Sequence, residues 1–210
     1  MYADAPAFHL AEYMRAIQTF ETVIGTVDRI PGVRSAAAIM GLPTGRYGSN
    51  GYCWVEGAHI QPGQDLFKTG RTRGVLPYAD LAVTTGGYLK TAGIPILAGR
   101  DFNEQDRCDR PFTAIISKSL LQRSFGFANP IGRRLYCGLD SPKPMTIVRV
   151  VGDVRQDSPA SPMEPAIYMP LQQHPFYANE VEIVVRAEGD AHGLIPLLVQ
   201  LMGQQAPGVT

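Results

Sequence analysis

The most informative part of this sequence is Leu81-Ala-Val-Thr-Thr-Gly-Gly-Tyr-Leu-Lys-Thr-Ala-Gly-Ile-Pro-Ile-Leu-Ala-Gly-Arg-Asp-Phe-Asn-Glu-Gln-Asp106. It predicts, in order, a strand, a short helix that begins at a glycine pair, a tight turn, a buried strand over 94–97 and an acidic loop. No catalytic or metal-binding motif elsewhere in the chain competes with this stretch. Function must therefore be inferred from this stretch together with the other segments of the sequence, and from the motifs that are missing.

Near the N-terminus, the sequence predicts an amphipathic helix. Apolar residues recur there every three or four positions, which places them on one helical face. They are Leu10, Tyr13, Ile17, Phe20, Ile24 and Val27. Pro31 and Gly32 predict the end of this helix, because proline cannot continue a helix and glycine readily adopts the left-handed turn. Residues 33–40 then have the apolar composition of a buried strand.

The rest of the chain alternates between strands, helices and loops. Glycine and proline mark irregular connections at 41–51 and 58–77. Further strands are predicted at 52–56, 80–85, 113–116, 133–137, 145–154, 166–169 and 181–186. Helices are predicted at 87–92, 117–125 and 190–204, with Ser117 as the N-cap of the second.

Both ends of the chain contain strands and helices of similar character, while the middle contains a small α/β unit. We therefore predict an α/β (α+β) fold with two lobes. One lobe is discontinuous and consists of residues 1–87 and 172–210. The other is an inserted small α/β lobe, residues 88–171.

Composition excludes several classes of partner. The 210 residues carry 19 basic and 19 acidic side chains, so the chain lacks the positive charge that binds nucleic acid or an anionic membrane surface. The longest apolar run, residues 36–42, is far shorter than the roughly 20 residues of a membrane-spanning helix. The N-terminus has no basic region followed by an apolar one, so we do not expect a signal peptide.

Three cysteines, Cys53, Cys108 and Cys137, lack the CxxC spacing of a structural zinc site. In an oxidising compartment a Cys108–Cys137 disulfide would close a loop of about thirty residues and contribute roughly 3–4 kcal/mol. We favour three thiols, because an odd count leaves at least one cysteine unpaired within the chain.

Two loops resemble ligand-binding motifs but lack the residues that bind. The glycine-rich loop 41–51 follows a strand, as a phosphate-binding loop does, yet Arg46 and Tyr47 stand where Lys and Ser or Thr are required. The alternating oxygen donors of 101–105 resemble the start of a calcium loop, but the turn glycine and the final glutamate are absent. We interpret this second loop as solvated, with Asp101 pairing with Arg100 or capping backbone N–H groups.

Candidate acid, base and nucleophile residues do not assemble into a motif. The four histidines, His9, His59, His174 and His192, lie far apart and lack metal-ligand spacing. Asp153 and Asp157 flank Arg155 at alternate positions, and we favour an exposed strand end with an arginine bridging two acids over an acid–base pair. Ser117 and Ser119 suit capping, and Cys137 with a distant histidine is a weak thiol candidate. We predict no catalytic residue, no cofactor and no metal site.

Four segments, in this order and spacing, resemble the periplasmic core domain of MacB-type ABC-transporter permeases, in particular the acidobacterial duplicated orphan permeases. They are Val83-Thr-Thr-Gly-Gly-Tyr-Leu-Lys-Thr-Ala-Gly-Ile-Pro-Ile-Leu-Ala-Gly-Arg-Asp-Phe102; Ala114-Ile-Ile-Ser-Lys-Ser-Leu-Leu-Gln-Arg-Ser-Phe125 with Asn129-Pro-Ile-Gly-Arg-Arg-Leu135; Ile147-Val-Arg-Val-Val-Gly-Asp-Val-Arg155; and Glu164-Pro-Ala-Ile-Tyr-Met-Pro170. The chain departs from the family at Thr85-Gly86, where serine-proline is usual, at Arg149, where glycine is common, and at Ser124-Phe125, which lacks the usual tryptophan.

The resemblance implies a porter-like βαβ lobe with an inserted small α/β lobe, in agreement with the two lobes predicted above. It implies a non-catalytic domain on the periplasmic side of the bacterial inner membrane, between two permease transmembrane helices. Its partners would be those helices, a cytoplasmic ABC ATPase, a periplasmic adaptor and a second permease copy, without nucleic acid. The domain would couple ATP-driven motion of the membrane part to export or extraction outside the membrane.

An alternative from a different class is a small-ligand-binding or sensor module. In that interpretation a cleft between the lobes, with Tyr47, Tyr52 and Trp54 near its mouth, holds an apolar molecule. A free-standing hydrolase is a third interpretation, and it requires a convergent nucleophile and base that the sequence does not show.

Overall fold

The structure is a computed structural model that describes residues 7–45, 49–56, 78–126, 128–137, 139, 141, 143–156, 158–174 and 181–205. Its helices are α1 (Ala7–Val27), α3 (Tyr88–Ala92), α4 (Lys118–Phe125), the 3₁₀ helix η2 (Ala191–Leu194) and α5 (Ile195–Gln205). Its strands are β1 (Val33–Met40), β2 (Ser49–Val55), β3 (Tyr78–Thr84), β4 (Ile96–Gly99), β5 (Phe112–Ser117), β6 (Arg134–Cys137), β7 (Met145–Val151), β8 (Ala166–Pro170) and β9 (Glu182–Ala187). The predicted α/β class is confirmed. None of the helices in these ranges combines the length and the apolar composition that crossing a membrane requires.

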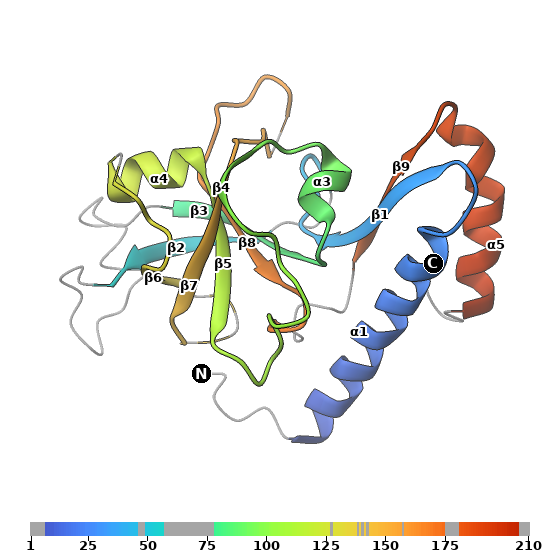
Figure 1. The fold of residues 1–210 in the computed structure, drawn as a ribbon, viewed down its shortest axis with the longest axis horizontal. Coiled ribbons are helices and arrows are strands. Elements are labelled where there is room, and N and C mark those ends of the chain that lie inside the picture. The colour runs from blue at the N-terminus through green and yellow to red at the C-terminus, as the bar shows by residue number, and fades with distance from the viewer. Residues whose placement is uncertain are drawn as a thin grey trace.

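All nine strands belong to one sheet, and six of them close into a ring (Figure 1). The ring runs β2-β6-β7-β5-β8-β3, and β2 pairs with β3 to close it. The β3–β8 and β5–β7 pairs are parallel and the other ring pairs are antiparallel. Two antiparallel strands, β1 and β9, extend the sheet beyond β3, and β4 pairs with β7.

Apolar side chains from all six ring strands form one buried cluster. Alternation along each strand sends every second residue to this cluster, as the two-residue period of a strand requires. Its members include Cys53, Leu81, Ala114, Leu135, Ile147 and Ile167. A second cluster lies on the other face of the sheet, where Tyr88 and Leu89 of α3 pack against Ala37 and Ile39 of β1.

The N-terminal helix follows its predicted apolar stripe but ends earlier than predicted. Ile17 and Val27 of the predicted stripe are buried, as is Val23, which was not part of it, and the helix stops at Val27, four positions before Pro31. The carboxylate of Asp28, which directly follows the helix, accepts a hydrogen bond from the Ala36 backbone N–H at 3.0 Å. That bond ties the turn after the helix to β1.

Serine and glycine set the ends of the two short helices. The Ser117 hydroxyl, fully buried, accepts from the Leu120 backbone N–H at 3.3 Å and from the Ala166 N–H at 2.9 Å. It therefore caps α4, as predicted, and also ties that helix to β8. Gly87 and Gly93, with φ of 83° and 74°, bound α3 in the left-handed region that glycine tolerates best.

The predicted buried strand over 94–97 is displaced and is not buried. The strand β4 covers Ile96–Gly99 instead, and all four of its residues are exposed. Pro95 lies outside β4, although its carbonyl accepts from the Gly152 backbone N–H at 2.8 Å. Among the described strands, β4 pairs with β7 alone. Its side chains therefore stay exposed although they are apolar. Several other boundaries also moved: β7 ends at Val151, β2 begins at Ser49, β3 begins at Tyr78, and the last helix starts with η2.

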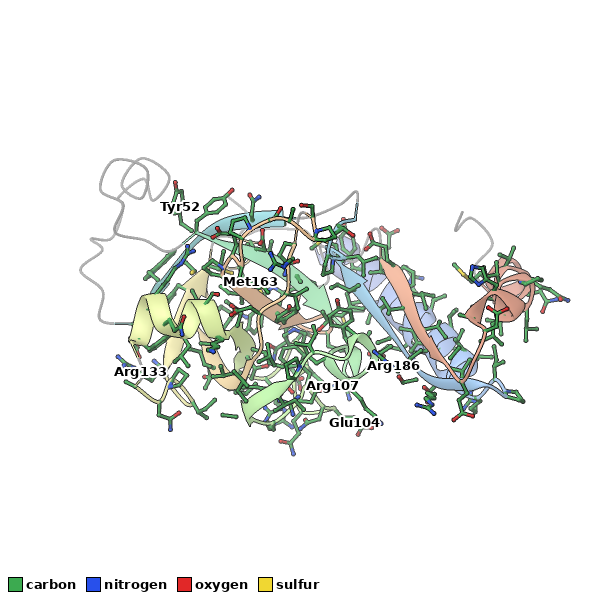
Figure 2. The ribbon with its side chains drawn as sticks, turned by 90° about the horizontal axis from the view of Figure 1, so that it is seen from above. Tyr52, Glu104, Arg107, Arg133, Met163 and Arg186 are labelled. Carbon is green, nitrogen blue, oxygen red and sulfur yellow. The ribbon has the colours of Figure 1, made fainter. Side chains whose placement is uncertain are left out.

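Strands assigned above to different lobes are hydrogen-bonded to each other. Strands β2 and β3 pair with β6 and β8, and α3 packs on β1. The Arg186 guanidinium of β9 donates from Nε to the Thr91 carbonyl at the end of α3 at 2.8 Å, and Figure 2 places Arg186 beside that helix. The division into residues 1–87 with 172–210 and 88–171 stays a prediction.

Candidate functional site

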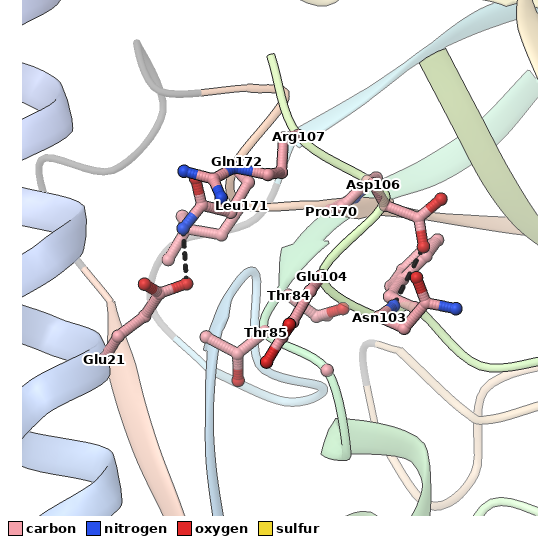
Figure 3. A pocket seen from close by; sticks show the side chains of 12 residues that line it. Glu21, Thr84, Thr85, Asn103, Glu104, Asp106, Arg107, Pro170, Leu171 and Gln172 are labelled. Atoms are coloured by element: carbon pink, nitrogen blue, oxygen red, sulfur yellow. Dashed lines mark hydrogen bonds between the residues drawn. The ribbon is translucent and has the colours of Figure 1, made fainter. Parts of the chain in front are cut away.

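A cleft of about 420 Å³ separates α1 from the loop that follows β4 (Figure 3). One wall carries Glu21 of α1, whose carboxylate accepts from the Gln172 side-chain amide at 2.6 Å. The opposite wall carries Asn103, Glu104 and Arg107. The floor consists of the end of β3 and the turn after β8, with Thr84, Thr85, Gly86, Pro170 and Leu171. The cleft thus lies where segment 88–171 meets the rest of the chain.

A buried carboxylate holds the loop wall in place. Asp106 is 3% exposed and accepts a bidentate pair of hydrogen bonds from Arg100, at 2.7 and 2.8 Å. It also accepts from the Asn103 backbone N–H and from the Thr113 hydroxyl, both at 2.9 Å. Bidentate, charge-assisted bonds of this kind are among the strongest in proteins, so the loop has one fixed conformation.

The pKa shifts of Asp106 and Arg100 agree with this geometry. Burial by itself raises the pKa of the Asp106 carboxyl, but bonds from Arg100, Asn103 and Thr113, with the Arg100 charge, outweigh it and hold the pKa below its ordinary value. The hydrogen bond to Asp106 in turn raises the pKa of Arg100. Both groups stay charged at neutral pH.

Gln173 extends the same network to the end of β8. Its carbonyl oxygen accepts from the Thr113 backbone N–H at 2.8 Å. Its amide nitrogen donates to the Arg107 and Pro111 carbonyls, each at 3.1 Å. The loop from Arg100 to Thr113 is therefore fixed at several points to the ring strands β5 and β8.

Of the two roles predicted for Asp101, capping of a backbone N–H is confirmed. Arg100 pairs with Asp106, and Asp101 accepts from the Phe102 backbone N–H at 2.9 Å while lying 3.4 Å from Nη1 of the buried Arg149. Asp101 thus does cap a backbone group, but it does not pair with Arg100 through its side chain. Sequence reasoning missed Asp106 because a carboxylate in an acidic loop is usually solvated, and no local pattern marks this one as buried.

Two of the three alternating residues at the end of β7 are described, and each contacts a backbone group. Asp153 accepts from the Ser119 backbone N–H at 2.7 Å and so caps α4 together with Ser117. Arg155 donates to the Ser161 carbonyl. Asp157 lies outside the described residues.

Histidines and cysteines in the described ranges also stay apart from the cleft. His174 packs its ring edge-on against Phe112 with 5.1 Å between centroids, and His192 bonds to Asp190 at 2.9 Å. His59 and the His9 side chain lie outside the description. All three cysteines are thiols; Cys137 is the register partner of Cys53, and its thiol donates to the Met169 sulfur at 3.8 Å. Within the part of the chain that is described, no three His, Cys, Asp or Glu side chains gather to hold a metal ion.

The aromatic residues expected at the mouth of a ligand cleft lie elsewhere. Tyr52 packs edge-on against Tyr78 at 5.3 Å and Trp54 stacks on Tyr136 at 5.4 Å, all on strands β2, β3 and β6. Figure 2 shows Tyr52 on the opposite side of the molecule from Glu104 and Arg107. Tyr47 lies outside the described residues. Phe102, Pro170 and Leu171 line the cleft together with its polar side chains, whereas Tyr52 and Trp54 do not line it.

Comparison with known proteins identifies the family. The model of the MacB-like periplasmic core domain matches residues 6–192, so the chain belongs to this family. Its fold is similar to the periplasmic region of MacB from Actinobacillus actinomycetemcomitans, with 15% identity, a TM-score of 0.58, and 88% of this chain and 72% of that one covered. It is also similar to the extracellular domain of the noncanonic ABC-type transporter YknZ from Gram-positive bacteria, with 16% identity, a TM-score of 0.56, and coverage of 89% and 83%. No curated protein sequence matches significantly.

Proposed function

We propose that this chain is the extracytoplasmic domain of a MacB-type ABC-transporter permease, on the periplasmic side of the bacterial inner membrane. It couples ATP-driven motion of the membrane part to export or extraction outside the membrane and has no catalytic role of its own. The observation that carries this proposal is the match of the MacB-like periplasmic core domain over residues 6–192. The folds of MacB and YknZ domains support it.

The arrangement of α1 and α5 suits a domain inserted between two membrane helices. The two helices are antiparallel neighbours, and the first turn of α1 and the last turn of α5 point to the same end of the molecule (Figure 1). Val23 and Val27 of α1 share one apolar cluster with Leu198 and Leu201 of α5. Motion of flanking transmembrane helices would enter the domain through this helix pair.

In this proposal, motion of the helix pair changes the distance between the two walls of the cleft. Its α1 wall belongs to the segments 1–87 and 172–210, while its loop wall is fixed to β5 and β8 by Asp106 and Gln173. In this proposal the two walls move relative to each other as rigid bodies, because they are attached to different elements. In this proposal the partners are the flanking permease helices, a cytoplasmic ABC ATPase, a periplasmic adaptor and a second permease copy.

Distance measurements in the full-length permease test the lever. Spin labels at Gln18 on α1 and Glu104 on the loop would report the width of the cleft in nucleotide-free and ATP-bound states. We expect the distance to change between the states, while a control pair at Glu104 and Arg133, both within 88–171, keeps its distance. A label at Glu104 alone reports the separation of two domain copies. If cleft width and copy separation were both unchanged, the lever would be refuted.

Small-ligand binding remains a second candidate function because of one observation in the cleft. The Thr84 hydroxyl is buried at 1% exposure and has no hydrogen-bond partner within the described residues. A polar ligand could supply one. A thermal-shift screen of polar metabolites separates the two functions, because a saturating ligand raises the unfolding temperature by mass action. A Thr84→Val variant should abolish any shift that arises in this cleft.

A further inference from the structure

Two cysteines that are far apart in sequence lie directly opposite each other in the sheet. Cys53 of β2 and Cys137 of β6 are register partners in an antiparallel pair. Residues opposite each other in such a pair point to the same face. Both side chains accordingly belong to the buried cluster inside the ring, with exposures of 0% and 4%.

The hydrogen-bond pattern shows which kind of pair they form. Antiparallel partners alternate between hydrogen-bonded and non-hydrogen-bonded pairs. The Glu56 backbone N–H donates to the Arg134 carbonyl at 2.9 Å, which makes these two residues a hydrogen-bonded pair. Cys53 and Cys137 lie three register positions away from that pair. Because the two types alternate, Cys53 and Cys137 are a non-hydrogen-bonded pair.

That type of pair suits a disulfide. Its Cα atoms are about 4.5 Å apart and its side chains are closer together than in the hydrogen-bonded type. A disulfide needs Cα atoms between roughly 4.4 and 6.8 Å apart. The third cysteine, Cys108, lies in the loop before β5 and has no such register partner in β2 or β6.

We propose that Cys53 and Cys137 form a disulfide that links β2 to β6, by exchange with a small disulfide oxidant. The thiolate of one cysteine attacks a sulfur of the oxidant, forms a mixed disulfide and expels one oxidant thiolate. The second cysteine attacks the protein sulfur of the mixed disulfide and expels the other. Two electrons and two protons pass from the protein to the oxidant, which leaves as two thiols.

Burial determines when this exchange takes place. Burial and the neighbouring Cys137 raise the pKa of the Cys53 thiol to about 12, so little thiolate is present in the folded chain at neutral pH. The thiolate is the attacking species. Exchange is therefore slow in the native protein and fast during folding, before the ring closes. The pairing does not depend on the proposed function.

Refolding in a glutathione buffer tests the pair. The reduced chain is unfolded, refolded with oxidised and reduced glutathione, alkylated and digested for mass spectrometry. We expect a peptide that links Cys53 to Cys137, with Cys108 alkylated. Recovery of both Cys53 and Cys137 as alkylated thiols, or a dominant link through Cys108, would overturn the proposal.

Variants and stability provide an independent readout. Cys108→Ser should keep the link, and a Cys53→Ala/Cys137→Ala double variant should lose it; circular dichroism checks that both fold. Closing a loop of roughly eighty residues should raise the urea midpoint of the oxidised chain by more than about 1 M over the reduced chain. The double variant should show no dependence on reductant. Equal midpoints for the oxidised and reduced wild type would refute a link across β2 and β6.

Discussion

Replacing Asp106 with asparagine should destabilise the chain much more than its position in an acidic loop implies. Asparagine has the same shape but only one accepting oxygen, and its amide would face the donors of Arg100. Asp106 accepts four hydrogen bonds, two of them from that guanidinium. Removing one partner of a buried pair costs about 3–5 kcal/mol. The Arg100 side chain is 43% exposed and keeps part of its hydration, so we expect a smaller loss, about 2–3 kcal/mol.

Urea unfolding of the 210-residue chain measures this loss. With an m-value of about 2–3 kcal/mol/M, the midpoint should fall by roughly 1 M at pH 7. Asp109→Asn is the matched control, because its side chain is 70% exposed and lies 4.0 Å from Arg110. Exposed pairs of this kind contribute about 0–1 kcal/mol, so the control midpoint should hardly move.

The pH dependence gives a sharper test. The pKa of Asp106 is lower in the folded than in the unfolded chain, so its stabilisation is complete above the unfolded value of about 3.9. It is lost as the pH falls through the lower, folded value. The difference between wild type and Asp106→Asn should therefore be constant at neutral pH and shrink below about pH 4. A variant as stable as the control, or a difference that grows in acid, would refute the buried network.

Four further substitutions test other parts of the fold, each by urea midpoint unless stated. Ser117→Ala removes an acceptor for two backbone N–H groups and should cost about 1–2 kcal/mol; an unchanged midpoint would contradict the double cap. Gly99→Ala places a Cβ 2.1 Å from a β7 carbonyl at a φ of +86° and should be strongly destabilising, whereas Gly25→Ala in α1, with open space around it, should stabilise by about 0.5–1 kcal/mol. The opposite order would be inconsistent with the structure. Arg186→Met removes the bond to the Thr91 carbonyl, and hydrogen exchange of the α3 amides should accelerate; equal protection would argue against that contact.

Local patterns made much of the fold predictable. The strand 33–40 was placed with its observed bounds, and Ser117 was correctly identified as a helix cap. Both follow from periodicity and capping chemistry, which act over a few residues. The cleft walls were not predictable in the same way. Asp106 is buried only because Arg100 and Thr113 converge on it, and nothing in the loop sequence records that convergence.

Strand pairing explains the remaining differences. The predicted strand at 94–97 was expected to be buried because Ile96 and Leu97 are apolar, yet their exposures are 53% and 52%. Burial of a strand depends on which other elements pack against it, and among the described strands β4 pairs with β7 alone. The opposition of Cys53 and Cys137 has the same origin, since the register of two strands more than eighty residues apart leaves no local trace.

Strand β3 belongs to the ring and also pairs with β1, the first of the two strands that extend the sheet. Along one edge it meets β2 through residues 78–81 and β1 only at Thr84 and Val83, while its other edge meets β8 over five register pairs. Within the sheet, the arm made of β1, β9, α1 and α5 joins the ring through a short ladder of two register pairs, while Ile17 of α1 packs in the ring cluster and Arg186 of β9 bonds to the end of α3. A torque applied at the helix pair would therefore reach the ring by two routes, the short ladder of β1 and the side-chain contacts of α1 and β9.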